Sequence, residues 1–293
     1  MILNSSRHPI ISAAFWMIGA LTSFSTMAVC GRELSSEVGT FQILFFRSGV
    51  GLLVIVFLLW RSGWRQILTR TPGLHLLRNL AHFGGQFGWF YGIAFIPFAE
   101  VFAIEFTTPI WTVGLAVLFL KERLTKTRIA TIVCGITGVL IILRPGLAII
   151  NPASLAVLAG ALGFAVTYTV TKKLSSSTSP LAILFYMTLV QLPLGLIPAL
   201  NSWVVPSPRL WPWVALVGIG ALSAHYCVVR ALSLVDAIAA VPMDFLRLPL
   251  IALVGFIFYN ETLEWFVPVG ALIMFSGNFL NILMEHRQKT NPG

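Results

Sequence analysis

The sequence FLKERL at residues 119–124 ends one long apolar segment, and FYNETL at residues 258–263 ends another, 139 residues later. A glycine stands sixteen residues after each glutamate, at Gly138 and Gly277. Self-similarity at a fixed offset is the sequence signature of a duplicated unit. The repeat therefore predicts two copies of one unit, residues 1–148 and 149–293.

An acidic residue and a proline inside the apolar segments follow the same offset, or one residue more. Glu105 aligns with Asp244, and Pro109 aligns with Pro249. Chance could produce any one of these matches, but their common offset favours duplication. Each copy is thus expected to carry an acid and a proline within the same apolar segment.

The composition of the whole chain is typical of an integral membrane protein. Hydrophobic residues make up 57% of the 293 residues and charged residues 10%, against about 45–50% and about 25% in soluble domains. The mean hydropathy is +0.90. The net charge of +9 does not indicate a nucleic-acid partner, because the basic residues form short clusters between apolar runs.

A membrane span needs about 20 mostly apolar residues, and a backbone exposed to lipid must satisfy its own hydrogen bonds, which favours helices. The sequence therefore predicts an all-α fold with ten transmembrane helices. The expected spans are 10–31, 38–60, 74–95, 98–120, 129–144, 153–172, 180–200, 212–234, 237–259 and 265–284.

The basic residues predict the orientation of these spans. The N-terminus, the even-numbered connections and the C-terminal tail hold 13 Lys and Arg residues, and the odd-numbered connections hold three. Cytoplasmic segments carry the excess of positive charge in membrane proteins. We expect a multi-pass protein of the inner (plasma) membrane, with both termini in the cytoplasm.

Each copy holds five expected spans, and an odd number places the second copy upside down relative to the first. Inverted repeats are typical of secondary transporters, which bind substrate near the middle of the membrane, between the repeats. A transporter is therefore favoured over a receptor or an enzyme. The chain also lacks HExxH, GxSxG and a Walker lysine motif, which argues against the commonest enzyme and ATPase sites.

A proline-containing span, a glutamate at its end and a glycine-bearing span, occurring twice, resemble the EamA-type drug/metabolite transporter superfamily over about residues 10–285. Within it, the chain is most similar to bacterial exporters of aromatic amino acids, the YddG type. The resemblance implies export of amino acids. The inverted repeat predicts alternating access, and the missing enzyme and metal motifs lead us to expect no catalytic residues, no cofactor and no metal. Carriers of quaternary ammonium drugs, nucleotide sugars or lipids share this fold and stay open as alternatives.

Charged residues inside the expected spans are candidates for the substrate site, because a charge in the bilayer is costly and needs a partner or a purpose. Glu105, Asp244 and Arg247 are such residues, and Arg47 is another. They could face a cavity and bind the ammonium and carboxylate groups of an amino acid. Alternatively they form an ion-pair network that holds the helices together. Asp244 and Arg247, three residues apart on one helix, could then pair with each other.

The third expected span carries two patterns. His82, Gln86 and Trp89 recur at the spacing of one helical face, and we expect them to line a cavity or to bond a neighbouring helix. His225 is the corresponding polar residue in the second copy. A stripe of small residues that favours close helix packing is formed by Gly84, Gly88 and Gly92.

Aromatic residues suggest the chemistry of the substrate. Trp16, Trp111 and Tyr168 lie within expected spans, as Trp89 does, and they are candidates to contact an aromatic ring. The charged ends of the fourth and ninth spans, including Glu122, predict helix capping or a gate. The expected partners are a small-molecule substrate and the lipid bilayer, and both a monomer and a dimer are open.

Overall fold

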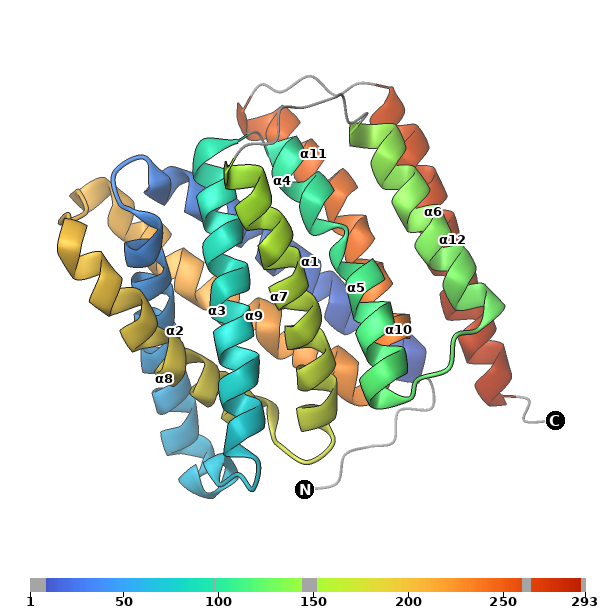
Figure 1. The fold of residues 1–293 in the computed structure, drawn as a ribbon, viewed down its shortest axis with the longest axis horizontal. Coiled ribbons are helices and arrows are strands. Elements are labelled where there is room, and N and C mark those ends of the chain that lie inside the picture. The colour runs from blue at the N-terminus through green and yellow to red at the C-terminus, as the bar shows by residue number, and fades with distance from the viewer. Residues whose placement is uncertain (1–8, 97, 144–151, 260–264, 291–293) are drawn as a thin grey trace.

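The computed structural model describes residues 9–96, 98–143, 152–259 and 265–290, and all regular elements in this part of the chain are helical (Figure 1). The first half contains α1 (Pro9–Ser35), α2 (Thr40–Ser62), α3 (Pro72–Phe95), α4 (Phe98–Glu105), α5 (Thr108–Leu115), the π-helical turn η2 (Ala116–Leu120) and α6 (Lys126–Leu143). The second half contains α7 (Pro152–Ser175), α8 (Pro180–Ala199), α9 (Trp211–Leu234), α10 (Ala237–Ala240), the 3-10 helix η5 (Val241–Leu246), α11 (Arg247–Tyr259) and α12 (Phe266–Thr290). Short 3-10 turns are η1 (Trp64–Ile67), η3 (Leu200–Ser202) and η4 (Pro208–Leu210).

Several helices are long and apolar enough to cross a bilayer. Six such stretches occur among the described residues: Pro9–Ser35, Thr40–Ser62, Pro152–Ser175, Pro180–Ser202, Pro208–Leu234 and Ala237–Phe258. The chain is therefore a multi-pass membrane protein. Helix α3 is less apolar because it carries a row of polar residues, and the helices from Thr108 to Leu120 and from Pro268 to Met284 are shorter. The full count of ten spans stays a prediction.

The fourth and ninth expected spans are each interrupted rather than continuous. Helix α4 ends at Glu105 and α5 begins at Thr108, directly before Pro109. In the second half, Asp244 lies in the 3-10 segment η5, between Pro242 and Pro249. Proline lacks a backbone N–H and clashes with the preceding turn, so it breaks regular α-helix. The two acids thus lie at the breaks between helices, and both breaks are buried inside the protein.

The helices of one half pack mainly on helices of the other. The most extensive contacts join α1 with α9, α3 with α7, α2 with α8, and α6 with α12 (Figure 1). Exchanging the halves maps the α1–α9 pair onto the α3–α7 pair and leaves the other two pairs in place. This pairing supports a pseudo-twofold relation between the halves. Inversion of the second half in the membrane stays a prediction.

Glycines let the backbones of α3 and α7 approach closely. A Cβ atom added at Gly88 would collide with the backbone carbonyl of Ala156, and one at Gly85 would lie 2.8 Å from the Phe164 ring. Gly84, by contrast, has open space around it. The packing stripe therefore consists of Gly85, Gly88 and Gly92. The prediction was correct for Gly88 and Gly92 but wrong for its first member, which it placed at Gly84.

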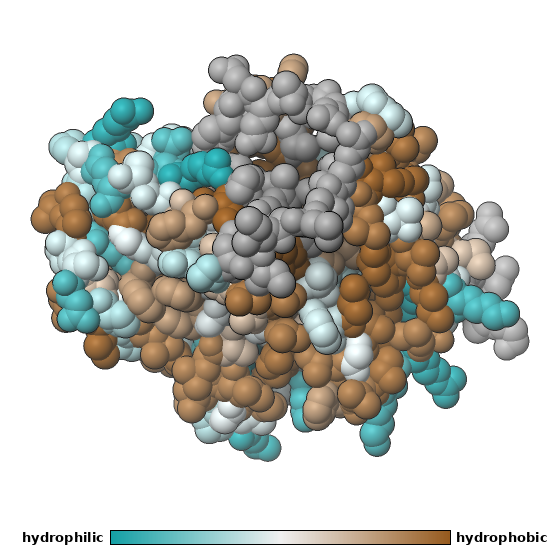
Figure 2. Space-filling model, turned by 45° about the horizontal axis from the view of Figure 1, so that its top comes forward, coloured by the Kyte–Doolittle hydropathy of each residue, from teal (hydrophilic) through white to brown (hydrophobic). Residues whose placement is uncertain are grey.

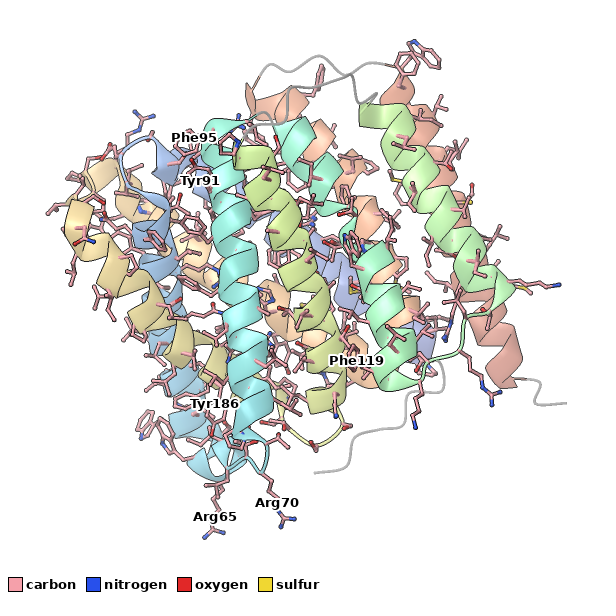
Figure 3. The ribbon with its side chains drawn as sticks, viewed as in Figure 1. Arg65, Arg70, Tyr91, Phe95, Phe119 and Tyr186 are labelled. Atoms are coloured by element: carbon pink, nitrogen blue, oxygen red, sulfur yellow. The ribbon has the colours of Figure 1, made fainter. Side chains whose placement is uncertain are left out.

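The outer surface has the character of a lipid-facing protein. Hydrophobic residues cover much of the flank, while hydrophilic side chains gather toward its edges (Figure 2). Arg65 and Arg70 lie at one end of the molecule, where α1 begins and α12 ends, and Tyr91 and Phe95 lie at the opposite end (Figures 1 and 3).

Candidate functional site

One face of α3 carries the polar side chains from which the site is built. His82, Gln86 and Trp89 lie on it as predicted, and Arg78 extends it by one turn. All four are buried, with exposed fractions of 0 to 2%. The rise of about 1.5 Å per residue spaces Arg78 and Trp89 about 16 Å apart along the helix axis. This face therefore runs through a large part of the membrane thickness.

A narrow cavity runs beside this face, between helices of both halves. Its free space is about 30 Å³, enough for about two water molecules. A metabolite therefore needs the surrounding helices to move apart before it can bind. The lining residues are Phe24, Met27, Arg78, His82, Gln86, Trp89, Glu105, Phe164, Thr167, Tyr168, Thr171, His225, Val228 and Arg247.

An ion cluster joins the two halves at one end of the cavity. Arg247 Nη2 lies 2.5 Å from Glu105 Oε1 and 2.9 Å from Asp244 Oδ2. Trp89 Nε1 donates a hydrogen bond of 2.6 Å to the second oxygen of Glu105. The predicted pairing of Asp244 with Arg247 is therefore present, and Glu105 bridges it to the first half. With two carboxylates and one guanidinium, the fully ionised cluster carries an excess negative charge.

Aromatic rings surround the cation of this cluster. The Arg247 guanidinium carbon lies 5.2 Å from the ring centre of Phe24 and 5.3 Å from that of Phe102. Such cation–π contacts stabilise a desolvated guanidinium by about 2 kcal/mol or more. The walls at this end thus suit both a cationic group and a flat ring.

A network of neutral and basic side chains occupies the other end. The rings of His82 and His225 lie with their centres 4.4 Å apart. Gln86 Nε2 lies 3.0 Å from His82 Nε2, and Gln191 Nε2 lies 2.8 Å from His82 Nδ1. Gln191 also accepts a 3.3 Å hydrogen bond from Arg47. His225 is therefore part of the same buried network as the polar face of α3.

Most of the predicted site residues come together in this cavity. Seven of them line it: His82, Gln86, Trp89, Glu105, Tyr168, His225 and Arg247. Asp244 contacts it through Arg247.

Trp16 and Trp111 lie outside the cavity. Trp16 packs edge-on against Tyr226 and beneath Arg230. Trp111 is 42% exposed on the outer surface, where its N–H donates to Thr107. Depth along a helix, on which their prediction rested, does not tell which way a side chain points.

Several residues that line the cavity or bond its lining residues carried no sequence signal that we recognised. Arg78 could have been found, because it precedes His82 by four residues on the same face, but its position near a helix end suggested a loop charge. Thr167 and Thr171 repeat at helical spacing on α7, yet threonine is common in such helices. Gln191 is a single amide in an apolar helix and belongs to no pattern.

Side chains tie the halves together on both sides of the cavity. One set of contacts lies at the end of the molecule where α6 begins, at Lys126. There the Glu122 carboxylate accepts hydrogen bonds of 2.9 and 3.0 Å from the N–H groups of Ala237 and Ile238, at the start of α10. Glu122 therefore caps the start of a helix in the other half, whereas the prediction placed its capping role at the end of its own span. At the opposite end, Glu37 accepts from Ser207 at 2.8 and 3.0 Å.

A second hollow opens at the end of the molecule where Tyr91 and Phe95 lie (Figure 3). Phe87 stacks on Tyr91 with ring centres 5.8 Å apart, and Gln42 also lines the hollow. The free space here is about 310 Å³. This outer hollow is roomier than the central cavity but holds none of the charged residues that line it.

Comparison with known proteins connects this geometry to a family. The EamA-like transporter family matches the chain twice, at residues 11–144 and 151–283. A riboflavin transporter of Vibrio cholerae is 30% identical over 92% of this chain and 90% of its own length. An S-adenosylmethionine uptake transporter of Rickettsia prowazekii is 26% identical over 99% and 98% of the two chains.

A further relative is similar in sequence, and one solved structure shows the same fold. A pseudopaline exporter of Pseudomonas aeruginosa is 25% identical over 94% of this chain and 95% of its own length. One crystal structure superposes with a TM-score of 0.79 over 96% of this chain and 99% of that chain, at 18% identity. None of the three named relatives is an exporter of aromatic amino acids, so they do not support that finer prediction. The two matched copies cover most of the sequence, and the chain belongs to the EamA-like transporter family.

Proposed function

We propose that this protein is a secondary transporter of small dipolar metabolites that carry an amino-acid head group and a flat ring, with S-adenosylmethionine as the first candidate. The observation that carries the proposal is the buried cavity between the halves, with acids and aromatic rings at one end and basic groups at the other. A binding site for small molecules needs a few oriented polar groups and an apolar wall.

The chemistry of the candidate fits each part of the cavity. S-Adenosylmethionine has an aromatic base, a sulfonium cation and an amino-acid head. Trp89, Phe164 and Tyr168 offer rings for the base, and Glu105 offers negative charge for a cation. The relatives that transport S-adenosylmethionine support this choice. Aromatic amino acids share the ring and the head group, and we retain them as weaker candidates.

Alternating access is the proposed mechanism. The cavity is too narrow for a metabolite, and contacts between the halves lie on both sides of it. Breaking one set of contacts at a time would open the cavity to one side of the membrane only. The proposal includes ten crossings, an inverted second half and cytoplasmic termini, the arrangement in which such rocking occurs.

Transport into liposomes tests this proposal. The purified protein would be offered radiolabelled S-adenosylmethionine, riboflavin, tryptophan, a sugar nucleotide and a quaternary ammonium drug. We expect saturable S-adenosylmethionine flux that Trp89→Phe lowers about tenfold, since a hydrogen bond to a charged group contributes about 1.5–3 kcal/mol. Trp60→Phe is the matched control, because Trp60 is 69% exposed. Flux of the drug or the sugar nucleotide alone would overturn the proposal.

A further inference from the structure

Two buried arginines near the cavity have no acidic partner among the residues that the structure describes. Arg47 on α2 and Arg78 on α3 are 2% and 1% exposed. Within the described part of the chain, neither forms an ion pair, because Glu105 and Asp244 are both bound to Arg247. Charges in a membrane interior are almost always paired or functional. These two cations therefore need an explanation beyond helix packing.

The groups that do contact the two arginines are neutral. Arg78 donates to Thr171 Oγ1 at 2.8 Å and to Asn79 Oδ1 at 2.7 Å. Arg47 donates to Gln191 Oε1 at 3.3 Å, and its Nε and Nη2 atoms are buried without a partner among the described residues. The like charges of the two guanidinium groups also repel each other. Unpaired hydrogen-bond donors and uncompensated positive charge are thus concentrated around Arg47 and Arg78.

The unpaired donors and positive charge of the two arginines can be reached from the cavity. Arg78 lines it directly, together with Thr171 and His225. Arg47 lies behind this wall and is linked to the lining residue His82 through Gln191. An anion that entered the cavity would therefore meet Arg78 first and Arg47 behind it. The histidines offer further donors at the same end.

The cavity as a whole is electrically asymmetric. At the Trp89 end, Glu105, Asp244 and Arg247 carry one more negative charge than positive. At the other end, Arg78 lines the cavity with a positive charge and Arg47 adds a second behind the wall. The two ends lie about 16 Å apart along α3, from Arg78 to Trp89. A substrate with its own charges separated by several bonds would lie along this axis.

We infer that Arg47 and Arg78 bind the anionic head of the transported molecule, a carboxylate or a phosphate, and orient its ring and cation toward Trp89 and Glu105. Guanidinium groups bind planar oxyanions through paired, charge-assisted hydrogen bonds. The inference deepens the proposed function and rests on it, since it assumes that the central cavity is the transport site.

Paired ligands that differ only in the carboxylate test the assignment. Binding of S-adenosylmethionine and of its decarboxylated analogue would be measured for the wild type, Arg78→Gln, Arg78→Lys and the exposed control Arg61→Gln. We expect Arg78→Gln to weaken S-adenosylmethionine binding about 10- to 100-fold, in the range of charged hydrogen bonds. Binding of the decarboxylated analogue should change less than about twofold. Equal losses for both ligands would overturn the inference.

Small anions provide a second measurement that does not depend on the transported substrate. Thermal unfolding of the wild type, Arg47→Gln and Arg78→Gln would be followed in sodium acetate, sodium phosphate and sodium chloride of equal ionic strength. A ligand that binds the folded state raises the unfolding temperature. We expect acetate or phosphate to stabilise the wild type and neither variant; the anion that acts identifies the head group.

The outcomes separate this inference from the proposed function. If no candidate substrate is transported but acetate or phosphate stabilises only the wild type, the anion site stands and the substrate proposal falls. If S-adenosylmethionine is transported and no anion acts, the anion site falls alone. Without ligand, Arg78→Gln should shift the unfolding temperature little, because it removes the repulsion from Arg47 together with the hydrogen bonds to Thr171 and Asn79. A lowered unfolding temperature together with unchanged ligand binding would show a purely structural role.

Discussion

At the scale of single residues, Arg247 holds the centre of the molecule together. It contacts an acid from each half, Glu105 at 2.5 Å and Asp244 at 2.9 Å. The repeat offset pairs these two acids with each other but places no arginine opposite Arg247 in the first half. The charge arrangement therefore breaks the symmetry that the helices follow, as the proposed dipolar substrate would require.

Replacing Arg247 tests how much this cluster stabilises the fold. Arg247→Gln would leave two buried carboxylates without their cation, and removing one partner of a buried pair costs about 3–5 kcal/mol. We expect an earlier unfolding transition in detergent and loss of transport. Adding Glu105→Gln to this variant should restore part of the stability, because one unpaired charge is removed. An unfolding midpoint equal to that of the wild type would contradict this assignment.

At the scale of elements, α3 has two functions on two faces. Its polar face lines the cavity, and its glycine face packs on α7. Small residues at a helix contact allow close approach in a membrane, where no hydrophobic driving force brings helices together. The position of the polar face relative to α7 therefore depends on these glycines.

Adding one methyl group to each of two glycines tests this contact. Gly88→Ala would press a Cβ atom against the Ala156 carbonyl and should destabilise the fold by about 1–3 kcal/mol, as overpacking does. Gly84→Ala is the matched control, because nothing lies within 4 Å of its added Cβ. It should be neutral or stabilise by up to about 1 kcal/mol through helix propensity. Equal thermal unfolding of both variants would contradict the packing account.

The loop contact between Glu37 and Ser207 should depend on pH. The backbone N–H and the hydroxyl of Ser207 donate to the Glu37 carboxylate, which lowers its pKa below the ordinary value. A lowered pKa means that the contact is fully present above the pKa of the free side chain and is lost as the pH falls through the lowered value. It should therefore be complete at neutral pH.

Hydrogen exchange of residues 203–210, corrected for intrinsic rates, measures this effect. Protection should fall in the wild type as the pH drops below about 4, near the pKa of a free glutamate. The Glu37→Gln variant should show low protection at neutral pH and also below about pH 4. If protection in the wild type does not change with pH, or changes equally in the variant, Glu37 is not the group that titrates.

Hydropathy predicted most of the long helices that the structure describes, since it acts locally. Helix α8, Pro180–Ala199, matches the expected span 180–200, and α7 begins at Pro152, the first helical turn where proline is favoured. The break between α4 and α5 was not predicted, although Pro109 was recognised. How far a proline disrupts a helix depends on neighbouring helices that satisfy the freed backbone groups, and a single sequence does not give these neighbours.

At the scale of the whole molecule, the repeat predicted two related halves but not how they pack. The family match to both halves confirms the duplication. The sequence found His82, Gln86 and Trp89 because they share one helical face. It could not find Gln191, whose contact with His82 depends on the packing of α8 against α3.

The proposed topology predicts which segments face each side of the membrane. With Cys30, Cys134 and Cys227 replaced by serine, single cysteines would be placed at Ser176 and Ser202, which are both exposed. A membrane-impermeant thiol reagent should reach Ser176→Cys from the cytoplasmic side and Ser202→Cys from the opposite side. Labelling of both positions from the same side would rule out this topology.

The central claim is that the cavity between the halves is the substrate site, and a structure with bound substrate tests it most directly. Cryo-electron microscopy of the protein with S-adenosylmethionine should show density between α3, α7 and α9. We predict that its carboxylate contacts Arg78 and that its base lies against Trp89. Density in the outer hollow near Tyr91 and Phe95, with the central cavity unchanged, would contradict the account.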